Sequence, residues 1–157
     1  MARKFELATG NLLMGRFLWL LLDVPEGWTV KVGDIPSDVY YTTIVEGNGW
    51  ITDGSTSYFL VNLVNGEVYD LELKVKKGVK ELGRLMTSGG EKTVVNGHIA
   101  SVVHREVKKG FRRTPMKQMA ITVPCDRTMR TIELTVTGKN SDGLDQIKQS
   151  LANSRCH

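Results

Sequence analysis

The sequence has few of the residues that stabilise a small fold through disulfides, bound metals or a restricted backbone. Among 157 residues there are two cysteines, four prolines and three histidines. Cys125 and Cys156 are too few for a disulfide scaffold. A chain of this length buries roughly two-thirds of its unfolded surface, so it needs neither a disulfide nor a metal to fold. We expect two thiols in a reducing cytosol, while a Cys125–Cys156 bridge stays open for a hyperthermophilic source.

Long hydrophobic runs and targeting signals are also lacking. The apolar run at residues 18–22 is far shorter than the ~20 residues that a membrane-spanning helix needs. It is followed by Asp23 and Pro25 rather than by a small-residue cleavage site. No Asn-x-Ser/Thr acceptor occurs, which fits an intracellular protein. These absences predict a cytoplasmic protein with no membrane span.

Nucleotide-binding and catalytic motifs are missing as well. The glycine-rich pieces at residues 47–49 and 88–90 match neither phosphate-cradling pattern. With 41% hydrophobic and 24% charged residues, the composition is that of a folded protein and excludes disorder, collagen and coiled coil. We find no repeat or linker, and predict a single domain over residues 1–157.

Two Asn-Gly pairs are the clearest local signals, because Asn-Gly favours the type I′ turn of a β-hairpin. Asn65-Gly66 predicts a hairpin between residues 57–64 and 67–75, with Leu60 facing Leu71 in two-residue register. The first of these strands is apolar on both faces, which favours a sheet with protein layers on each side. Asn96-Gly97 predicts a second hairpin, between residues 92–95 and 98–107.

The second half of the chain predicts an antiparallel meander and a closing helix. Strands are expected at residues 117–123 and 129–137, the latter with period-two alternation. Ser141-Asp142 can cap a helix in which Leu144, Ile147 and Leu151 share one face. Further strands are expected at residues 17–24, 28–32 and 39–45, and a short helical stripe at residues 79–86. We therefore predict an α+β fold.

The order of these features resembles that of Mog1/PsbP-like domains. The resemblance rests on the opening Asp23-Val-Pro-Glu-Gly-Trp28, the strand start Asn96-Gly-His-Ile-Ala100, the strand at residues 130–136 and the closing helix. It covers most of the chain, but it concerns a pattern of elements rather than a motif. The aromatic residues usual around the final strand are absent. The resemblance implies an α-β-α sandwich around a mostly antiparallel sheet and supplies no catalytic residue.

Metal-binding and nucleophilic sites have candidate residues but no recognisable pattern. His98 and His104 lie about 20 Å apart along one strand and cannot share an ion. A combination of either with Cys125 and Cys156 is geometrically open, yet zinc-ligand spacing is absent. Arg127 and Arg130 lie near Cys125, and cations favour a reactive thiolate, but no histidine partner is recognisable. We expect no metal and no cofactor.

The strongest non-core feature is a basic hairpin tip in the C-terminal part. Residues 91–157 carry 12 Lys and Arg against 6 Asp and Glu, whereas residues 1–90 carry 9 against 11. Cations around an aromatic residue suit an acidic protein surface, anionic headgroups or a single-stranded nucleic acid. A solvated turn is the alternative interpretation. The predicted partner-binding residues are Lys108, Lys109, Phe111, Arg112, Arg113 and Lys117.

The function predicted from these features is that of a small non-enzymatic binding or accessory protein of unknown partner, for which the hairpin suggests an acidic protein or a nucleic acid. One alternative is a nucleic-acid-associated protein that uses the hairpin at residues 108–117. A weaker alternative is a thiol- or metal-dependent enzyme centred on Cys125. The sequence leaves the partner and the oligomeric state open.

Overall fold

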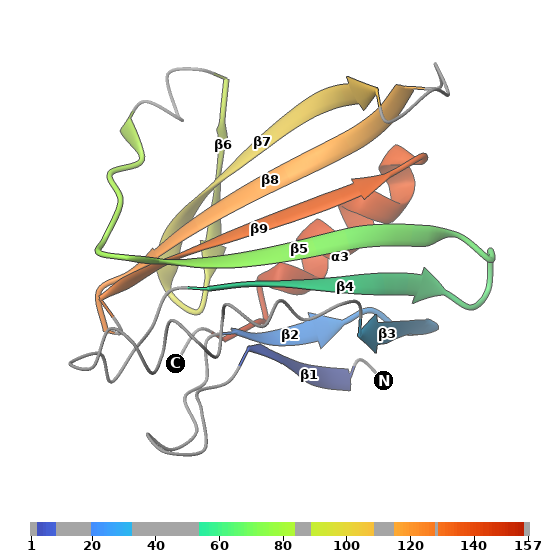
Figure 1. Cartoon of the computed structure of the whole chain (residues 1–157), viewed down its shortest axis with the longest axis horizontal. Helices are drawn as coiled ribbons and strands as arrows, with labels where there is room; N and C mark the ends of the chain where they lie inside the picture. The colour runs from blue at the N-terminus through green and yellow to red at the C-terminus, as the bar shows by residue number, and fades with distance from the viewer. Residues whose placement is uncertain are drawn as a thin grey trace.

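A computed structural model describes residues 3–8, 20–32, 54–83, 89–108, 115–127 and 129–155 (Figure 1). Seven antiparallel strands form one sheet in the order β3-β4-β5-β9-β8-β7-β6, and β1 and β2 form a separate hairpin pair. The strands are β1 (Arg3–Ala8), β2 (Leu20–Val24), β3 (Trp28–Val32), β4 (Gly54–Asn62), β5 (Val68–Lys77), β6 (Glu91–Val95), β7 (His98–Lys108), β8 (Pro115–Cys125) and β9 (Arg130–Gly138). The helix α3 (Ser141–Leu151) follows β9.

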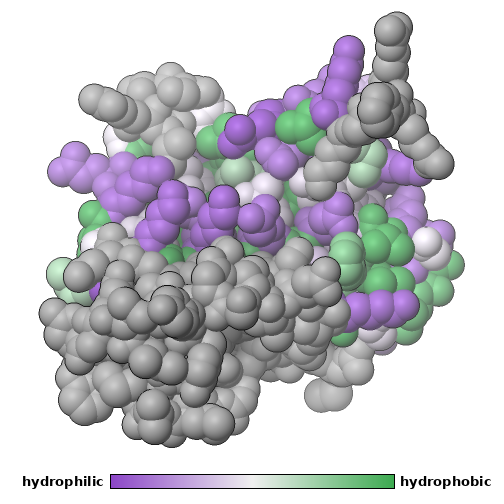
Figure 2. Space-filling model, viewed as in Figure 1, coloured by the Kyte–Doolittle hydropathy of each residue, from purple (hydrophilic) through white to green (hydrophobic). Residues whose placement is uncertain are grey.

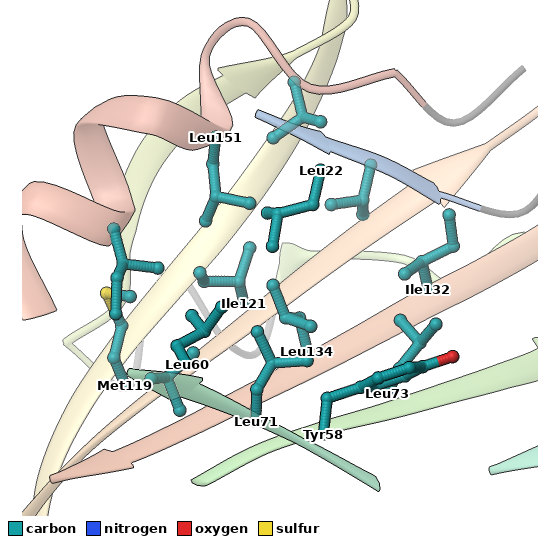
Figure 3. Close-up of a cluster of buried hydrophobic side chains, with 14 of the residues drawn as sticks. Leu22, Tyr58, Leu60, Leu71, Leu73, Met119, Ile121, Ile132, Leu134 and Leu151 are labelled. Atoms are coloured by element: carbon teal, nitrogen blue, oxygen red, sulfur yellow. The ribbon is translucent and has the colours of Figure 1, made fainter. Parts of the chain in front are cut away.

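The core lies between one face of the sheet and a cover made of α3 and β2. Leu22 of β2 and Leu151 of α3 point toward the aliphatic side chains of the sheet (Figure 3). A bond from the Asp23 amide to Ser154 Oγ, 2.9 Å long, ties β2 to the residues that follow α3. This arrangement buries the even-numbered side chains of β9, such as Leu134, and the odd-numbered ones of β5, such as Leu71.

The predicted α-β-α sandwich is wrong. The described chain is a β-rich fold in which α3 covers one face of the sheet (Figure 1). The face away from α3 carries charged and small polar side chains, seen as a hydrophilic band in Figure 2. Phe59 of β4, expected to be covered, is 37% exposed on this face. The described residues therefore cover the sheet on one face only, in contrast to the prediction made from the apolar residues of β4.

The two Asn-Gly hairpins behave differently. At Asn96-Gly97 both residues have positive φ, and Val95 pairs with His98 across a two-residue turn, as predicted. At Asn65-Gly66 only the glycine has positive φ, and Tyr58 rather than Leu60 pairs with Leu71. The predicted register is wrong by two residues, which leaves the same side chains facing the core.

The side chain of Asn62 explains the longer turn between β4 and β5. Its Oδ1 accepts hydrogen bonds from the amides of Val64 and Asn65, at 2.9 and 3.2 Å. The amide of Leu63 donates to the carbonyl of Gly27 at 2.8 Å. These bonds give the backbone amides of the turn partners that a two-residue hairpin would not provide. Five residues therefore separate the end of β4 from the start of β5.

The meander of β6 to β9 and the closing helix are confirmed, with one change at the helix start. The N-cap is Asn140 rather than Ser141-Asp142, and its side chain accepts from the Asp142 amide at 3.0 Å. Residues 79–82 are not helical, and residues 84–86 of the expected stripe lie outside the described residues, as does the expected strand at 39–45. Within the described ranges, no helix is long and apolar enough to cross a membrane.

Tyr69 is the aromatic centre of the contact between sheet and helix. The residue is 1% exposed, and its ring lies 5.2 Å from the Trp28 ring, centroid to centroid. The hydroxyl group contacts a Glu67 carboxylate oxygen at 2.9 Å and the Asn140 carbonyl at 3.2 Å. Burial, and then the hydrogen bond with the Glu67 carboxylate, raise the pKa of Tyr69 well above its ordinary value.

This shift predicts an alkaline loss of stability. Above the ordinary tyrosine pKa of about 10, the unfolded chain releases the Tyr69 proton while the folded chain keeps it, so unfolding becomes more favourable as the pH rises. The slope contributed by Tyr69 is ~1.4 kcal/mol per pH unit. In urea unfolding between pH 9 and 11, the stability of the wild type should fall more steeply as the pH rises and approach this slope only above pH 10, whereas Tyr69→Phe should show a shallower slope. Equal slopes in the two proteins would contradict the prediction.

Candidate functional site

The structure describes only the base of the predicted basic hairpin. Lys108 ends β7 and pairs with Pro115 of β8, and Lys117 pairs with Glu106. Both lysines are exposed. Lys109, Phe111, Arg112 and Arg113 lie outside the described residues. β7 extends to Lys108 and β8 begins at Pro115, so Lys108 and Lys117 lie in paired strands rather than in the predicted turn, and residues 109–114 connect the two strands.

A groove of about 290 Å³ opens beside this base, between the β7–β8 pair and the first turns of α3. Because side chains alternate along a strand, His104, Glu106 and Lys117 point to the side of the sheet that α3 covers. Leu144 of α3 gives the groove an apolar surface, and Asp145 lies one residue further along. The groove lining is His104, Arg105, Glu106, Lys117, Gln118, Ser141, Leu144 and Asp145.

An ion pair between β6 and α3 lies near the same groove. Lys148 Nζ donates to Glu91 Oε2, and His104 Nε2 lies 4.0 Å from the same oxygen. The hydrogen bond and the charge of Lys148 hold the pKa of Glu91 below its usual range, with a smaller contribution from His104. The pair links the edge strand β6 to α3, and it leaves His104 beside an acidic group at one wall of the groove.

A second cluster lies at the opposite end of β7 and β8. Cys125 Sγ is 3.6 Å from His98 Nε2, and His98 Nδ1 is 3.6 Å from Asp126 Oδ1. Cys125 ends β8 and is fully buried, whereas the Asp126 side chain is 78% exposed in the turn that follows. Arg130 of β9 pairs directly with Cys125 and donates from Nη1 to the Met129 carbonyl at 3.1 Å. Cys125, His98 and Asp126 therefore form a chain of contacts.

The sequence left a combination of His98 with Cys125 open but did not predict that the two side chains are in contact. Ser101 pairs with Thr122, and continuing this antiparallel register places His98 opposite Cys125. Directly opposite residues have Cβ atoms about 4.5–5.5 Å apart, which is contact distance for these side chains. The Asn96-Gly97 turn and the lengths of β7 and β8 contain the information that brings these two residues together. It could be used only with the pairing register of β7 and β8, which the sequence does not state. Cys156 and His157 lie outside the described residues.

No protein-family model matches the chain, and no curated protein matches it. The resemblance to Mog1/PsbP-like domains stays a prediction.

Proposed function

We propose that the protein is a small non-enzymatic binding or accessory protein of the cytoplasm, and that it docks an acidic partner at the β7–β8 hairpin. The observation that carries the proposal is the position of Lys108 and Lys117, exposed at the same end of two paired strands. The connection between them has three further cations and no acidic residue in the sequence. Five cations in ten residues, attached to a rigid strand pair, form a suitable surface for an acidic ligand.

The groove beside Lys117 gives this surface a second, apolar component. Leu144 supplies a hydrophobic contact, while Glu106 and Asp145 offset part of the positive charge there. The net attraction for an acidic partner therefore comes mainly from the hairpin connection, and the groove provides shape and apolar area. This division predicts that hairpin charges control the salt dependence of binding.

The geometry argues against a nucleophilic enzyme centred on Cys125. Its side chain is fully buried, so a substrate could not reach the sulfur without movement of the surrounding residues. A nucleic-acid ligand remains the second candidate, because the exposed cations at the hairpin base would bind a phosphate backbone equally well.

Charge reversal at the hairpin tests the proposal. In Arg112→Glu/Arg113→Glu, we expect affinity for a labelled polyglutamate peptide to fall more than tenfold, because like charges at an interface cost several kcal/mol. Stability should change by less than about 0.5 kcal/mol per substitution, as is usual at surfaces. Fluorescence anisotropy at low and high salt measures the affinity, and added salt should mimic the substitution.

Lys74→Glu/Lys76→Glu is the matched control. It makes the same change in charge on β5, where the two side chains are 50% and 59% exposed. This control should bind the peptide nearly as the wild type does. An equal loss in both double variants would show a non-specific effect of net charge, and unchanged binding by the hairpin variant would reject the proposal. Binding of a single-stranded oligonucleotide but not of the peptide would favour the nucleic-acid alternative.

A further inference from the structure

Three charged side chains at the groove between the β7–β8 pair and α3 are not used by the fold. They belong to Glu106, Lys117 and Asp145. Within the part of the chain that the structure describes, none of these side chains forms an ion pair or a hydrogen bond. Glu106 and Lys117 lie directly opposite each other on paired strands, yet they form no ion pair. Their charged groups are therefore available to a ligand.

The groove has room for one large side chain. Its volume of about 290 Å³ lies just below the ~300–1,000 Å³ that is typical of small-molecule sites. An apolar cavity of ~150 Å³ already binds benzene, so an aromatic ring can enter a groove of this size. Leu144 provides an apolar contact from α3, and the hydrocarbon part of Lys117 provides another from β8. The groove therefore suits a single aromatic residue of a partner.

The charges of the groove favour an aromatic residue that also has a hydrogen-bond donor. Glu106 and Asp145 offer ionised carboxylates, which accept hydrogen bonds and cannot donate them. An indole N–H can donate to such an oxygen in a charge-assisted bond, whereas a phenyl ring cannot. An ammonium group such as that of Lys117 is attracted to the face of an aromatic ring, most strongly to that of tryptophan. An acidic side chain would instead be repelled by the two carboxylates.

We propose that the groove binds a tryptophan side chain of an acidic partner segment. The inference rests on the proposed function, because the hairpin supplies the cations that attract the acidic residues on either side of the tryptophan. Lys108 and Lys117 lie at the same end of the sheet as the first turn of α3, so one short segment can reach both surfaces (Figure 1). Protein interfaces commonly place an aromatic anchor in a pocket, with charged groups around it.

Labelled peptides that differ at one position test the anchor. They are polyglutamate and three versions in which the central residue is tryptophan, phenylalanine or alanine. By fluorescence anisotropy, we expect the wild type to bind the tryptophan peptide about tenfold more tightly than the alanine peptide, because an anchor that fills a pocket contributes much of the binding energy. The phenylalanine peptide should lie between them. Arg112→Glu/Arg113→Glu should weaken binding of all the peptides but keep the ratio of tryptophan to alanine affinities.

Variants of the groove test its location. Ser141 is exposed and lines the groove, so Ser141→Phe should fill it and remove the preference for tryptophan, with affinity for polyglutamate nearly unchanged. Gln149→Phe is the matched control, since Gln149 is exposed on the same helix outside the groove, and it should keep the preference. Glu106→Gln/Asp145→Asn should bind polyglutamate more tightly, because two repelling charges are gone, and lose most of the advantage of tryptophan over phenylalanine.

The outcomes separate this inference from the proposed function. Equal affinities of the wild type for the tryptophan and alanine peptides would overturn the inference and leave the proposed function intact, whereas failure to bind any acidic peptide would overturn both. A tryptophan preference that survives in Ser141→Phe would also overturn it. If Ser141→Phe does not fold, Glu106→Gln/Asp145→Asn decides, because it changes only exposed side chains. An unchanged advantage of tryptophan over phenylalanine in that variant would reject the groove as the site.

Discussion

Gly138→Ala should destabilise the protein by ~3 kcal/mol or more, because the added methyl group has no space. Continuing the β5–β9 register places Gly138 directly opposite Tyr69. A Cβ atom built on Gly138 would overlap the Tyr69 ring, and one built on Gly143 of α3 would overlap its hydroxyl end. The ring is therefore enclosed between β9 and the first turn of the helix. Urea unfolding followed by circular dichroism measures the loss.

A smaller side chain at position 69 should relieve this clash. In a Tyr69→Leu background, Gly138→Ala should cost far less than it does in the wild type, because the two residues are in contact and their effects are not additive. Gly83→Ala is the matched control, since an added Cβ there meets no atom within 4 Å and no positive φ is required. Equal midpoints for Gly138→Ala and Gly83→Ala would contradict this account of the core.

The second large effect is expected at Trp28. This side chain is 2% exposed, packs on Tyr69 and donates from Nε1 to Gln146 Oε1 at 3.1 Å. Trp28→Ala should cost ~3–5 kcal/mol through lost apolar burial and the cavity that remains. Trp28→Phe retains much of the ring packing and should cost less. Thermal and urea unfolding of the two variants give the comparison.

Phe59→Ala is the control for Trp28. It removes an aromatic ring from the same sheet, but Phe59 is 37% exposed on the face away from α3. Its truncation should therefore cost clearly less than that of Trp28. If both truncations lower the free energy of unfolding equally, the contact between β3 and α3 through Trp28 does not hold the fold together as described.

Local sequence signals predicted most of the strands, because they act over a few residues. Asn96-Gly97 supplied both positive φ angles of its turn, and the alternation of β9 identified its buried side chains. The turn at Asn65-Gly66 could not be predicted from the dipeptide, since the side chain of Asn62 competes for the same amides. The free energy by which one dipeptide favours a turn type is small compared with that of several hydrogen bonds in the folded protein.

Features that depend on distant residues were not predictable from the sequence alone. A layer on each side of the sheet was expected from the apolar faces of β4, and the α-β-α arrangement from the resemblance to Mog1/PsbP-like domains. The polar pattern of β5 and β9 instead agrees with a sheet that α3 covers on one face. The approach of His98 to Cys125 depends on the pairing of whole strands. The basic hairpin remains a prediction, because its tip lies outside the described residues.

The pairing of β5 with β9 has a consequence for how fast the chain reaches this structure. Lys77 pairs with Arg130, so this central ladder forms only after a long loop closes, whereas β4–β5 and the β6–β9 meander consist of neighbouring strands. Non-local pairing of this kind gives a high contact order, and β-rich proteins of high contact order fold in milliseconds to seconds. Until that ladder closes, the facing edges of β5 and β9 expose unpaired amides, so newly made chains are most prone to aggregate at the centre of the final sheet.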